Sequence, residues 1–153
     1  MINHIFLDLD GVLADFHEVF EQYTREEWLG GQFEQFVKNR GFLKLKRMRD
    51  AQALMSYLDT LNVPVTILSS AGGVEHLYEE ICSQKFDWLK ENHINYAAII
   101  VENKEMKASF ARKSTLLIDD QSINTENFIK AGGLAIRHTL AENTIERIKE
   151  ILW

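Results

Sequence analysis

The sequence predicts an α/β protein in which a central parallel sheet of about five strands carries helices on both faces. Two observations lead to this prediction. After residue 60, short apolar segments alternate with amphipathic helical patterns, which is typical of a parallel sheet covered on both sides. Before that alternation, residues 15–59 combine helical patterns with glycine breaks. This stretch is too long for a tight crossover and too well patterned for a linker, so we expect a small helical cap inserted after the first strand.

The predicted strands are short, apolar and rich in β-branched residues. They cover residues 5–9, 64–70, 96–101, 115–118 and 133–136. Helical patterns cover residues 74–91, 122–131 and 143–152 in the core, and 17–28, 33–37 and 50–61 in or next to the insertion. Residues 104–112 read as a polar, helical connector, and Ser122 or Asn124 is the expected cap of the helix that follows. We therefore expect residues 1–14 and 60–153 to form the core and residues 15–59 the cap.

The composition is that of an ordinary globular domain. The chain has 153 residues, of which 46% are hydrophobic and 26% charged. Its formal net charge of -6 argues against binding to duplex nucleic acid, which relies on dense Lys and Arg contacts. The single cysteine, Cys82, excludes an internal disulfide and fits a reducing compartment. Without a leader pattern or a long apolar run, we expect a cytoplasmic protein with no membrane association; the sequence also allows a homodimer.

Three predicted strands end in polar side chains. These are Asp8 and Asp10, Ser69 and Ser70, and Asp119 and Asp120. Because the carboxyl ends of parallel strands meet at one edge of the sheet, we expect these side chains to lie close together. The strand period of two also sends Asp8 and Asp10 to the same side. Like charges at close range repel, so a divalent cation, or different roles for the two carboxylates, would explain the arrangement.

The carboxylates have the chemistry needed for phosphoryl transfer. Asp8 and Asp119 or Asp120, with a backbone carbonyl near Asp10, would hold Mg²⁺. Asp8 would attack phosphorus as a nucleophile, and Asp10 would act as general acid and then general base. The sequence therefore predicts a magnesium-dependent site for a phosphate ester.

The remaining polar groups would hold the phosphate. The Ser69 hydroxyl would donate to a phosphoryl oxygen, and free amides around Ser70 and Ala71 would bind the same group. A lysine would neutralise the charge that develops during transfer. Both Lys104 and Lys107 precede the fourth strand, and we prefer Lys107 because it leads directly into that strand.

The order of these motifs resembles the haloacid dehalogenase (HAD) superfamily of phosphohydrolases along essentially the whole chain. The motifs are Asp8-Leu9-Asp10-Gly11-Val12, Ile67-Leu68-Ser69, a lysine, and Leu117-Ile118-Asp119-Asp120. The longer motifs Asp8 to Phe16, Gln84-Lys85-Phe86-Asp87-Trp88-Leu89 and Leu116 to Asp120 are similar to the 5'(3')-deoxyribonucleotidase family. This resemblance implies a Rossmann-like core with a cap after the first strand, an aspartyl-phosphate intermediate, Mg²⁺, and a nucleoside monophosphate as the substrate.

The resemblance also implies a role for individual residues. Asp8 matches the nucleophile, Asp10 the acid/base, Ser69 the phosphate-binding hydroxyl, Lys107 the lysine, and Phe16 an aromatic residue that lies against the substrate base. Asp119 matches the metal aspartate and Asp120 a second acidic position near the metal, which completes the expected metal set of Asp8, Asp10, Asp119 and Asp120. Ser70 and Ala71 complete the expected substrate contacts.

Other functions are compatible with the same residues. A phosphatase for a sugar phosphate or for a nucleic-acid 3' phosphate would use the same core. A non-catalytic phosphate-binding protein that keeps the HAD-like fold is a further alternative, and the intact set of Asp8, Asp10, Ser69 and Asp119 speaks against it. The motif after Ser70 reads Ala71-Gly72-Gly73, where the nucleotidase family often has a proline. The loop there is therefore not carried over from that family.

Overall fold

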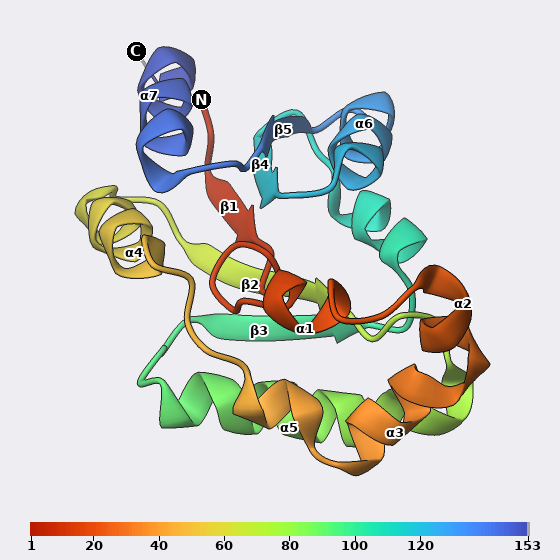
Figure 1. The fold of residues 1–153 in the computed structure, drawn as a ribbon. Coiled ribbons are helices and arrows are strands. Elements are labelled where there is room, and N and C mark those ends of the chain that lie inside the picture. Colours follow the sequence, from red (N-terminus) through yellow and green to blue (C-terminus); the bar gives the residue numbers. More distant parts are fainter. Residues whose placement is uncertain (153) are drawn as a thin grey trace.

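A five-stranded parallel sheet forms the centre of the protein, as the sequence predicts. The computed structural model describes residues 1–152. The strands are β1 (His4–Leu7), β2 (Val65–Ser70), β3 (Ala97–Val101), β4 (Thr115–Asp119) and β5 (Leu134–Arg137). Their order in the sheet is β3-β2-β1-β4-β5, and every neighbouring pair is parallel (Figure 1).

The first strand occupies the middle of the sheet, where the strand order reverses. Leu7 at the end of β1 pairs with Ile67 of β2 on one side and with Ile118 of β4 on the other. Strand β3 lies beyond β2 on one side, and strand β5 lies beyond β4 on the other. Ligand sites of open α/β sheets lie outside the carboxyl ends of the strands at such a reversal. The residues that follow β1, β2 and β4 therefore share one edge.

Both faces of the sheet are covered by apolar side chains, because alternate residues of a strand point to opposite sides. Ile5 and Leu7 belong to one buried cluster together with side chains of helices α4, α5 and α7, whereas Phe6 belongs to a second cluster together with Phe128 of helix α6. These helices are α4 (Ala51–Thr60), α5 (Tyr78–Glu91), α6 (Ser122–Lys130) and α7 (Ala141–Leu152). The layered α/β prediction is confirmed.

Residues 15–59 form several short helices instead of the longer ones suggested by the sequence. The elements are α1 (His17–Phe20), α2 (Arg25–Glu27), a π-helical turn (Trp28–Gln32), α3 (Phe33–Lys38), a 3₁₀ turn (Gly41–Lys44) and α4. The pattern at residues 17–28 is interrupted because Thr24 starts a new helix, and its hydroxyl and the Glu27 carboxylate cap each other's backbone amides. The last element, α4, packs against α7. The division of the chain into core and cap remains a prediction.

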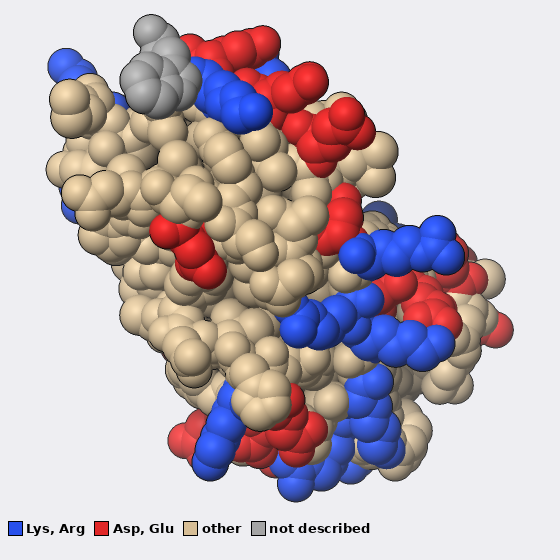
Figure 2. All heavy atoms as spheres, turned by 90° about the vertical axis from the view of Figure 1, so that its left-hand side faces the viewer, with Lys and Arg blue, Asp and Glu red and all other residues tan. Residues whose placement is uncertain are grey.

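The charged surface is mixed in sign. Figure 2 shows one face of the molecule, where Lys and Arg side chains gather toward one side with Asp and Glu side chains among them. Lys46 pairs with Glu18, and Arg40 pairs with Asp87, each at 3.0 Å. Across residues 1–152, no helix is both long enough and apolar enough to span a bilayer.

Candidate active site

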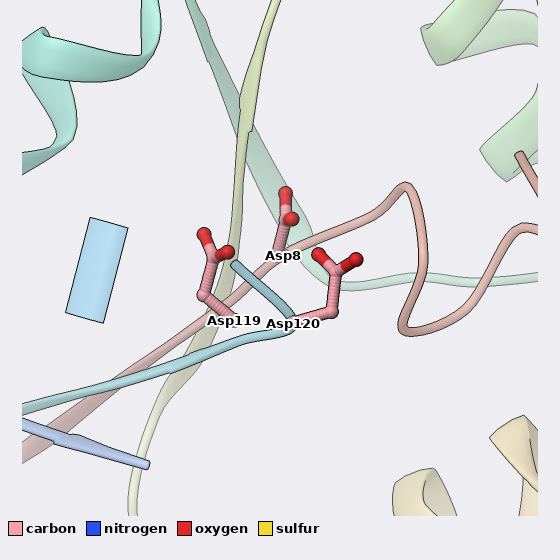
Figure 3. A group of neighbouring side chains, drawn as sticks. All are labelled: Asp8, Asp119 and Asp120. Atoms are coloured by element: carbon pink, nitrogen blue, oxygen red, sulfur yellow. The ribbon is translucent and has the colours of Figure 1, made fainter. Parts of the chain in front are cut away.

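Three carboxylates from two strand ends meet at the predicted edge of the sheet. Asp8 directly follows β1, and its backbone amide donates to the carbonyl of Ile118 at 2.9 Å. Asp119 ends β4 and is fully buried, and Asp120 follows it. Figure 3 shows the three side chains pointing toward one region. One oxygen from each of Asp8, Asp119 and Asp120 lies within 4.8 Å of the others. The sequence-based expectation that these groups lie close together is met.

Gly11 allows this close approach. Its φ of 81° lies in the left-handed region that side chains other than glycine rarely adopt. A Cβ atom at this position would also overlap the carboxylate of Asp120. A glycine is therefore needed here both for the backbone turn after Asp10 and for the space that Asp120 occupies.

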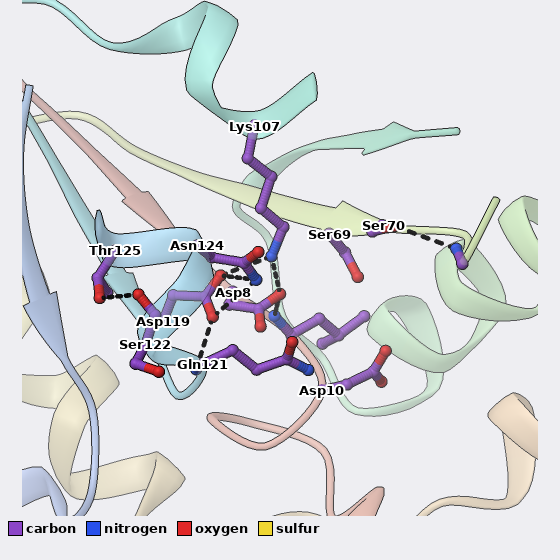
Figure 4. Close-up of polar contacts among 12 residues, drawn as sticks. Asp8, Asp10, Ser69, Ser70, Lys107, Asp119, Gln121, Ser122, Asn124 and Thr125 are labelled. Carbon is purple, nitrogen blue, oxygen red and sulfur yellow. Dashed lines mark hydrogen bonds and ion pairs between the residues drawn. The ribbon is translucent and has the colours of Figure 1, made fainter. Parts of the chain in front are cut away.

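Lys107 joins two of the carboxylates. It comes from the 3₁₀ segment η4 (Lys104–Phe110), and its Nζ donates to Oδ1 of Asp8 at 2.8 Å and to Oδ2 of Asp119 at 2.7 Å (Figure 4). Its side chain is buried, whereas Lys104 is exposed and lines the mouth of the neighbouring cavity. Of the two lysines considered from the sequence, Lys107 is the one that reaches the carboxylates.

The pKa values of these groups show the cost of crowding negative charge. Burial raises the pKa of Asp8 well above its usual range; the charge of Asp119 adds to this effect, and Lys107 opposes it. Burial and then Asp119 raise the pKa of Asp120, against the effect of His17, whose Nε2 lies 3.1 Å from Asp120. Burial alone would lower the pKa of Lys107, but Asp8 and Asp119 raise it above its ordinary value. A cation bound here would relieve the repulsion.

Asn124 and Gln121 hold the Asp119 side chain from helix α6. The Asn124 amide lies 3.1 Å from each oxygen of Asp119, and the Gln121 backbone amide donates to its Oδ1 at 2.9 Å. The expectation that Ser122 or Asn124 caps this helix is wrong. Gln121 is the N-cap residue and its side chain makes no capping hydrogen bond, while the Asn124 side chain is turned toward Asp119 from inside the helix. The sequence analysis did not assign Asn124 to the site.

Asp10 lies apart from this group and is paired with a second lysine. Lys85 of helix α5 places its Nζ 2.5 Å from Oδ2 of Asp10, 2.7 Å from Oγ of Ser69 and 2.9 Å from the carbonyl of Ser70. The Asp10 carboxylate is not part of the three-carboxylate cluster, so the side chains that could hold a metal in this arrangement are Asp8, Asp119 and Asp120. The sequence analysis did not assign Lys85 to the site. The available signal was that this lysine falls on the same helical face as the apolar residues Ile81 and Trp88.

The loop after β2 differs from the expectation in one respect. The amide of Ala71 is not free for a phosphate, because it donates to the carbonyl of Val101 at 2.8 Å and so continues the sheet pairing. The Gly72 amide donates to Oγ of Ser70 at 3.1 Å. Ser69 is buried, with its hydroxyl beside Lys85, and it lines the cavity. The hydroxyl of Ser69 is therefore better placed for an anion than the amide of Ala71.

A cavity of about 440 Å³ connects the charged groups with an aromatic wall. This volume is in the range of small-molecule sites. The charged and polar side chains that line it include Asp8, Asp10, Ser69, Lys107 and Asn124. The aromatic side chains that line it, which form the aromatic wall, are Phe16, Trp28, Phe33 and Phe42.

Phe16, expected to contact a substrate base, is part of this aromatic wall. Its ring stacks on Phe42 with centroids 5.6 Å apart and planes 7° from parallel. Trp28 meets Phe16 edge-on at 5.7 Å. Phe16 therefore packs within the wall and also lines the cavity.

Comparison with solved structures shows that the chain has the fold of HAD-superfamily hydrolases. A HAD-superfamily hydrolase from Ehrlichia chaffeensis aligns over 100% of both chains with a TM-score of 0.62 and 14% identity. A hydrolase from Streptococcus pneumoniae aligns over 97% of this chain and 98% of its own, with a TM-score of 0.57 and 15% identity. No protein-family model and no curated protein matches the sequence.

A third structure contains ligands. It is an aspartate-to-alanine variant of a HAD family enzyme from Bacteroides thetaiotaomicron in complex with magnesium and inorganic phosphate. It aligns over 91% of this chain and 95% of its own, with a TM-score of 0.53 and 14% identity. At these identities the likeness shows a shared fold, and the resemblance to deoxyribonucleotidases remains a prediction.

Proposed function

We propose that this protein is a magnesium-dependent phosphatase that hydrolyses a small phosphate monoester through an aspartyl-phosphate on Asp8. The observation that carries the proposal is the meeting of Asp8, Asp119 and Asp120 at the carboxyl edge of the sheet, with Lys107 between two of them and Asp10 nearby. The magnesium and phosphate bound by the Bacteroides protein of the same fold support it.

The residues present fit a magnesium ion. Four carboxylates, including Asp10, face only two ammonium groups, so the ionised site is short of positive charge. Lys107 and the Leu9 amide both donate to Oδ1 of Asp8, and within residues 1–152 no hydrogen bond reaches its Oδ2. Oδ1 of Asp120 is buried and also lacks a hydrogen-bond partner there. Such hard oxygen atoms are the ligands that Mg²⁺ prefers. When bound, the ion would offset phosphate charge and orient the phosphoryl group.

In the first step, a carboxylate oxygen of Asp8 forms a bond to phosphorus while the bond from phosphorus to the ester oxygen breaks. Asp10, protonated at this stage, gives its proton to the departing oxygen, which leaves as an alcohol. Lys107 holds the Asp8 side chain from its other oxygen, and the Ser69 hydroxyl donates to a phosphoryl oxygen.

In the second step, water attacks the phosphorus of the aspartyl-phosphate. Asp10 now takes a proton from that water, and the bond between phosphorus and the Asp8 oxygen breaks. Inorganic phosphate leaves, Asp8 is again a carboxylate and Asp10 is again protonated. The two aspartates thus perform different tasks, as their different surroundings in the structure suggest.

We further propose that the substrate carries a flat organic group, and that a nucleoside 5'-monophosphate is the best candidate. A phosphate among the polar groups would place an attached base toward Phe16 and Phe42, whose faces offer stacking contacts. All four aromatic residues of the wall belong to residues 15–59. This supports a division in which the cap determines specificity for the organic group and the core binds the phosphate. A sugar phosphate would gain less from aromatic stacking.

A panel of phosphate esters tests the function. Phosphate release is measured with deoxynucleoside 5'-monophosphates, sugar phosphates, 3'-phosphorylated oligonucleotides and p-nitrophenyl phosphate, with Mg²⁺ and with EDTA. We expect turnover that requires Mg²⁺ and is fastest with a nucleotide. Preference for a sugar phosphate or an oligonucleotide would overturn the substrate assignment alone. Binding of inorganic phosphate without turnover of any ester would identify a non-catalytic phosphate-binding protein.

A further inference from the structure

Lys85 is a buried cation with three oxygen partners. Its side chain is 1% exposed and lies on the inner face of α5. A buried ammonium group is costly unless it is paired and hydrogen-bonded. The Asp10 carboxylate, the Ser69 hydroxyl and the Ser70 carbonyl together use its three N–H donors. The ring of Phe42 lies 4.7 Å from the same nitrogen. The contacts of Lys85 are therefore saturated and leave no N–H for a substrate.

The contact with Ser69 decides which way its hydroxyl points. An ammonium group only donates hydrogen bonds, so Oγ of Ser69 must accept from Lys85. Within residues 1–152, this hydroxyl has no other hydrogen-bond partner. Because Ser69 also lines the cavity, its own hydrogen remains available to an anionic oxygen there. Lys85 thereby prepares Ser69 as a donor.

The contact with Asp10 selects between its two oxygens. Oδ2 accepts from Lys85, whereas Oδ1 is buried and, within the described chain, has no hydrogen-bond partner. A buried oxygen without a partner is unfavourable, so the orientation of this carboxylate depends on the contact of Oδ2 with Lys85. Without Lys85, the carboxylate would be free to rotate between these positions.

Helix α5 is anchored independently of Lys85. The side chain of Gln84 donates to the carbonyl of Val37 at 2.7 Å and accepts from the amide of Phe42 at 3.1 Å. The indole of Trp88 donates to the carbonyl of Leu45 at 2.7 Å. These contacts bind the helix to residues 37–45, so the position of Lys85 does not depend on its own ion pair. Gln84 also provides a buried neighbour that does not touch Asp10.

We propose that Lys85 is a positioning residue for the phosphatase reaction, because it fixes the Asp10 carboxylate through Oδ2 for proton transfer and turns the Ser69 hydroxyl toward the phosphate. This inference rests on the proposed function. It gives Lys85 a role in the reaction, whereas its neighbours Gln84 and Trp88 anchor helix α5.

The test separates proton transfer from general damage by the choice of leaving group. The kcat of Lys85→Met is measured with Mg²⁺ on p-nitrophenyl phosphate, whose leaving group needs little protonation, and on the best alkyl phosphate of the panel, whose leaving group needs a proton. We expect a loss of about 100-fold on the alkyl ester and about tenfold or less on the aryl ester. Gln84→Met, the matched control, should leave the ratio of the two rates unchanged.

A second comparison asks whether Lys85 acts through Asp10. In the background of Asp10→Asn, Lys85→Met should cost far less on the alkyl ester than in the native protein, because residues that act as a unit are non-additive. Full additivity, or equal losses of Lys85→Met on both esters, would overturn the inference and leave Lys85 a structural residue.

Folding and the proposed function are checked separately. If circular dichroism shows that Lys85→Met does not fold, Lys85→Gln, which keeps two N–H donors and removes the charge, is measured for the same ratio of rates. A native protein that hydrolyses both esters while the variant slows them equally refutes only the role of Lys85. A native protein that hydrolyses neither ester refutes the proposed function, and the inference with it.

Discussion

Each half of the site contains a buried lysine, and the two lysines bind carboxylates in different ways. Lys107 lies between Asp8 and Asp119, which are both buried, and Asp120 adds further negative charge. Lys85 pairs with one carboxylate, Asp10, whose side chain is 22% exposed. The first half therefore has an excess of negative charge that suits a cation. The second half has one carboxylate for one ammonium group, and its carboxylate is partly exposed.

The first prediction changes Asp8, the proposed nucleophile, in the half proposed to bind the metal. Asp8→Asn should reduce kcat by about 10⁴-fold or more on every ester, because an amide does not form the acyl-phosphate. Phosphate release with Mg²⁺ measures the loss, and circular dichroism checks that the variant is folded. Activity unchanged from the native protein would show that Asp8 is not the nucleophile.

The second prediction compares the two lysines by stability. In EDTA, Lys107→Met should lower the free energy of unfolding by about 3–5 kcal/mol, because Asp8 and Asp119 lose a buried partner. Lys85→Met should cost less, since Asp10 is partly exposed to water. Urea denaturation measures both. Equal costs would mean that the two halves do not differ in their electrostatics.

The third prediction addresses the acid/base half. Asp10→Asn should lower kcat by about 10²–10³-fold on an alkyl phosphate, because the leaving oxygen no longer receives a proton. On p-nitrophenyl phosphate the loss should be smaller, since that leaving group is stable as an anion. Steady-state kinetics on the two esters measure the difference. A loss of the same size on both would argue against Asp10 as the general acid.

The fourth prediction concerns magnesium without turnover. Mg²⁺ at about 100 times its Kd should stabilise the native protein by about 2.7 kcal/mol, because only the folded chain brings the three carboxylates together. Thermal unfolding with and without Mg²⁺ measures the effect. Asp120→Asn should reduce it, and Asp10→Asn, the matched control outside the three-carboxylate cluster, should retain it. The reverse pattern would place the ion at the other half.

The fifth prediction concerns the aromatic wall and has the smallest expected effect. Phe16→Ala should raise KM for a nucleoside monophosphate about tenfold, in line with the loss of one stacking contact of roughly 1–1.5 kcal/mol. KM for a small alkyl phosphate should stay near the native value. Parallel kinetics on the two substrates check this. Equal changes in both would show that Phe16 packs without contacting the organic group.

Much of the fold and of the three-carboxylate cluster could be predicted because both follow from local sequence patterns. The apolar segments around Ile5 and Leu116 predicted buried strands, and their polar ends predicted that Asp8 and Asp119 would share an edge. The acid/base half was harder to predict. Lys85 stands in an ordinary helical pattern, 75 residues along the chain from Asp10, and no local rule links them.

The sequence by itself determined the alternation of strands and helices and the carboxylates at the strand ends, because hydrophobic period and turn chemistry are local properties of the chain. Only the tertiary structure decided which donors meet those carboxylates. It selected Lys107 over Lys104, brought Lys85 to Asp10 and used the Ala71 amide in the sheet. Such pairings depend on the packing of distant elements, where the need to satisfy every buried charge and amide selects one arrangement.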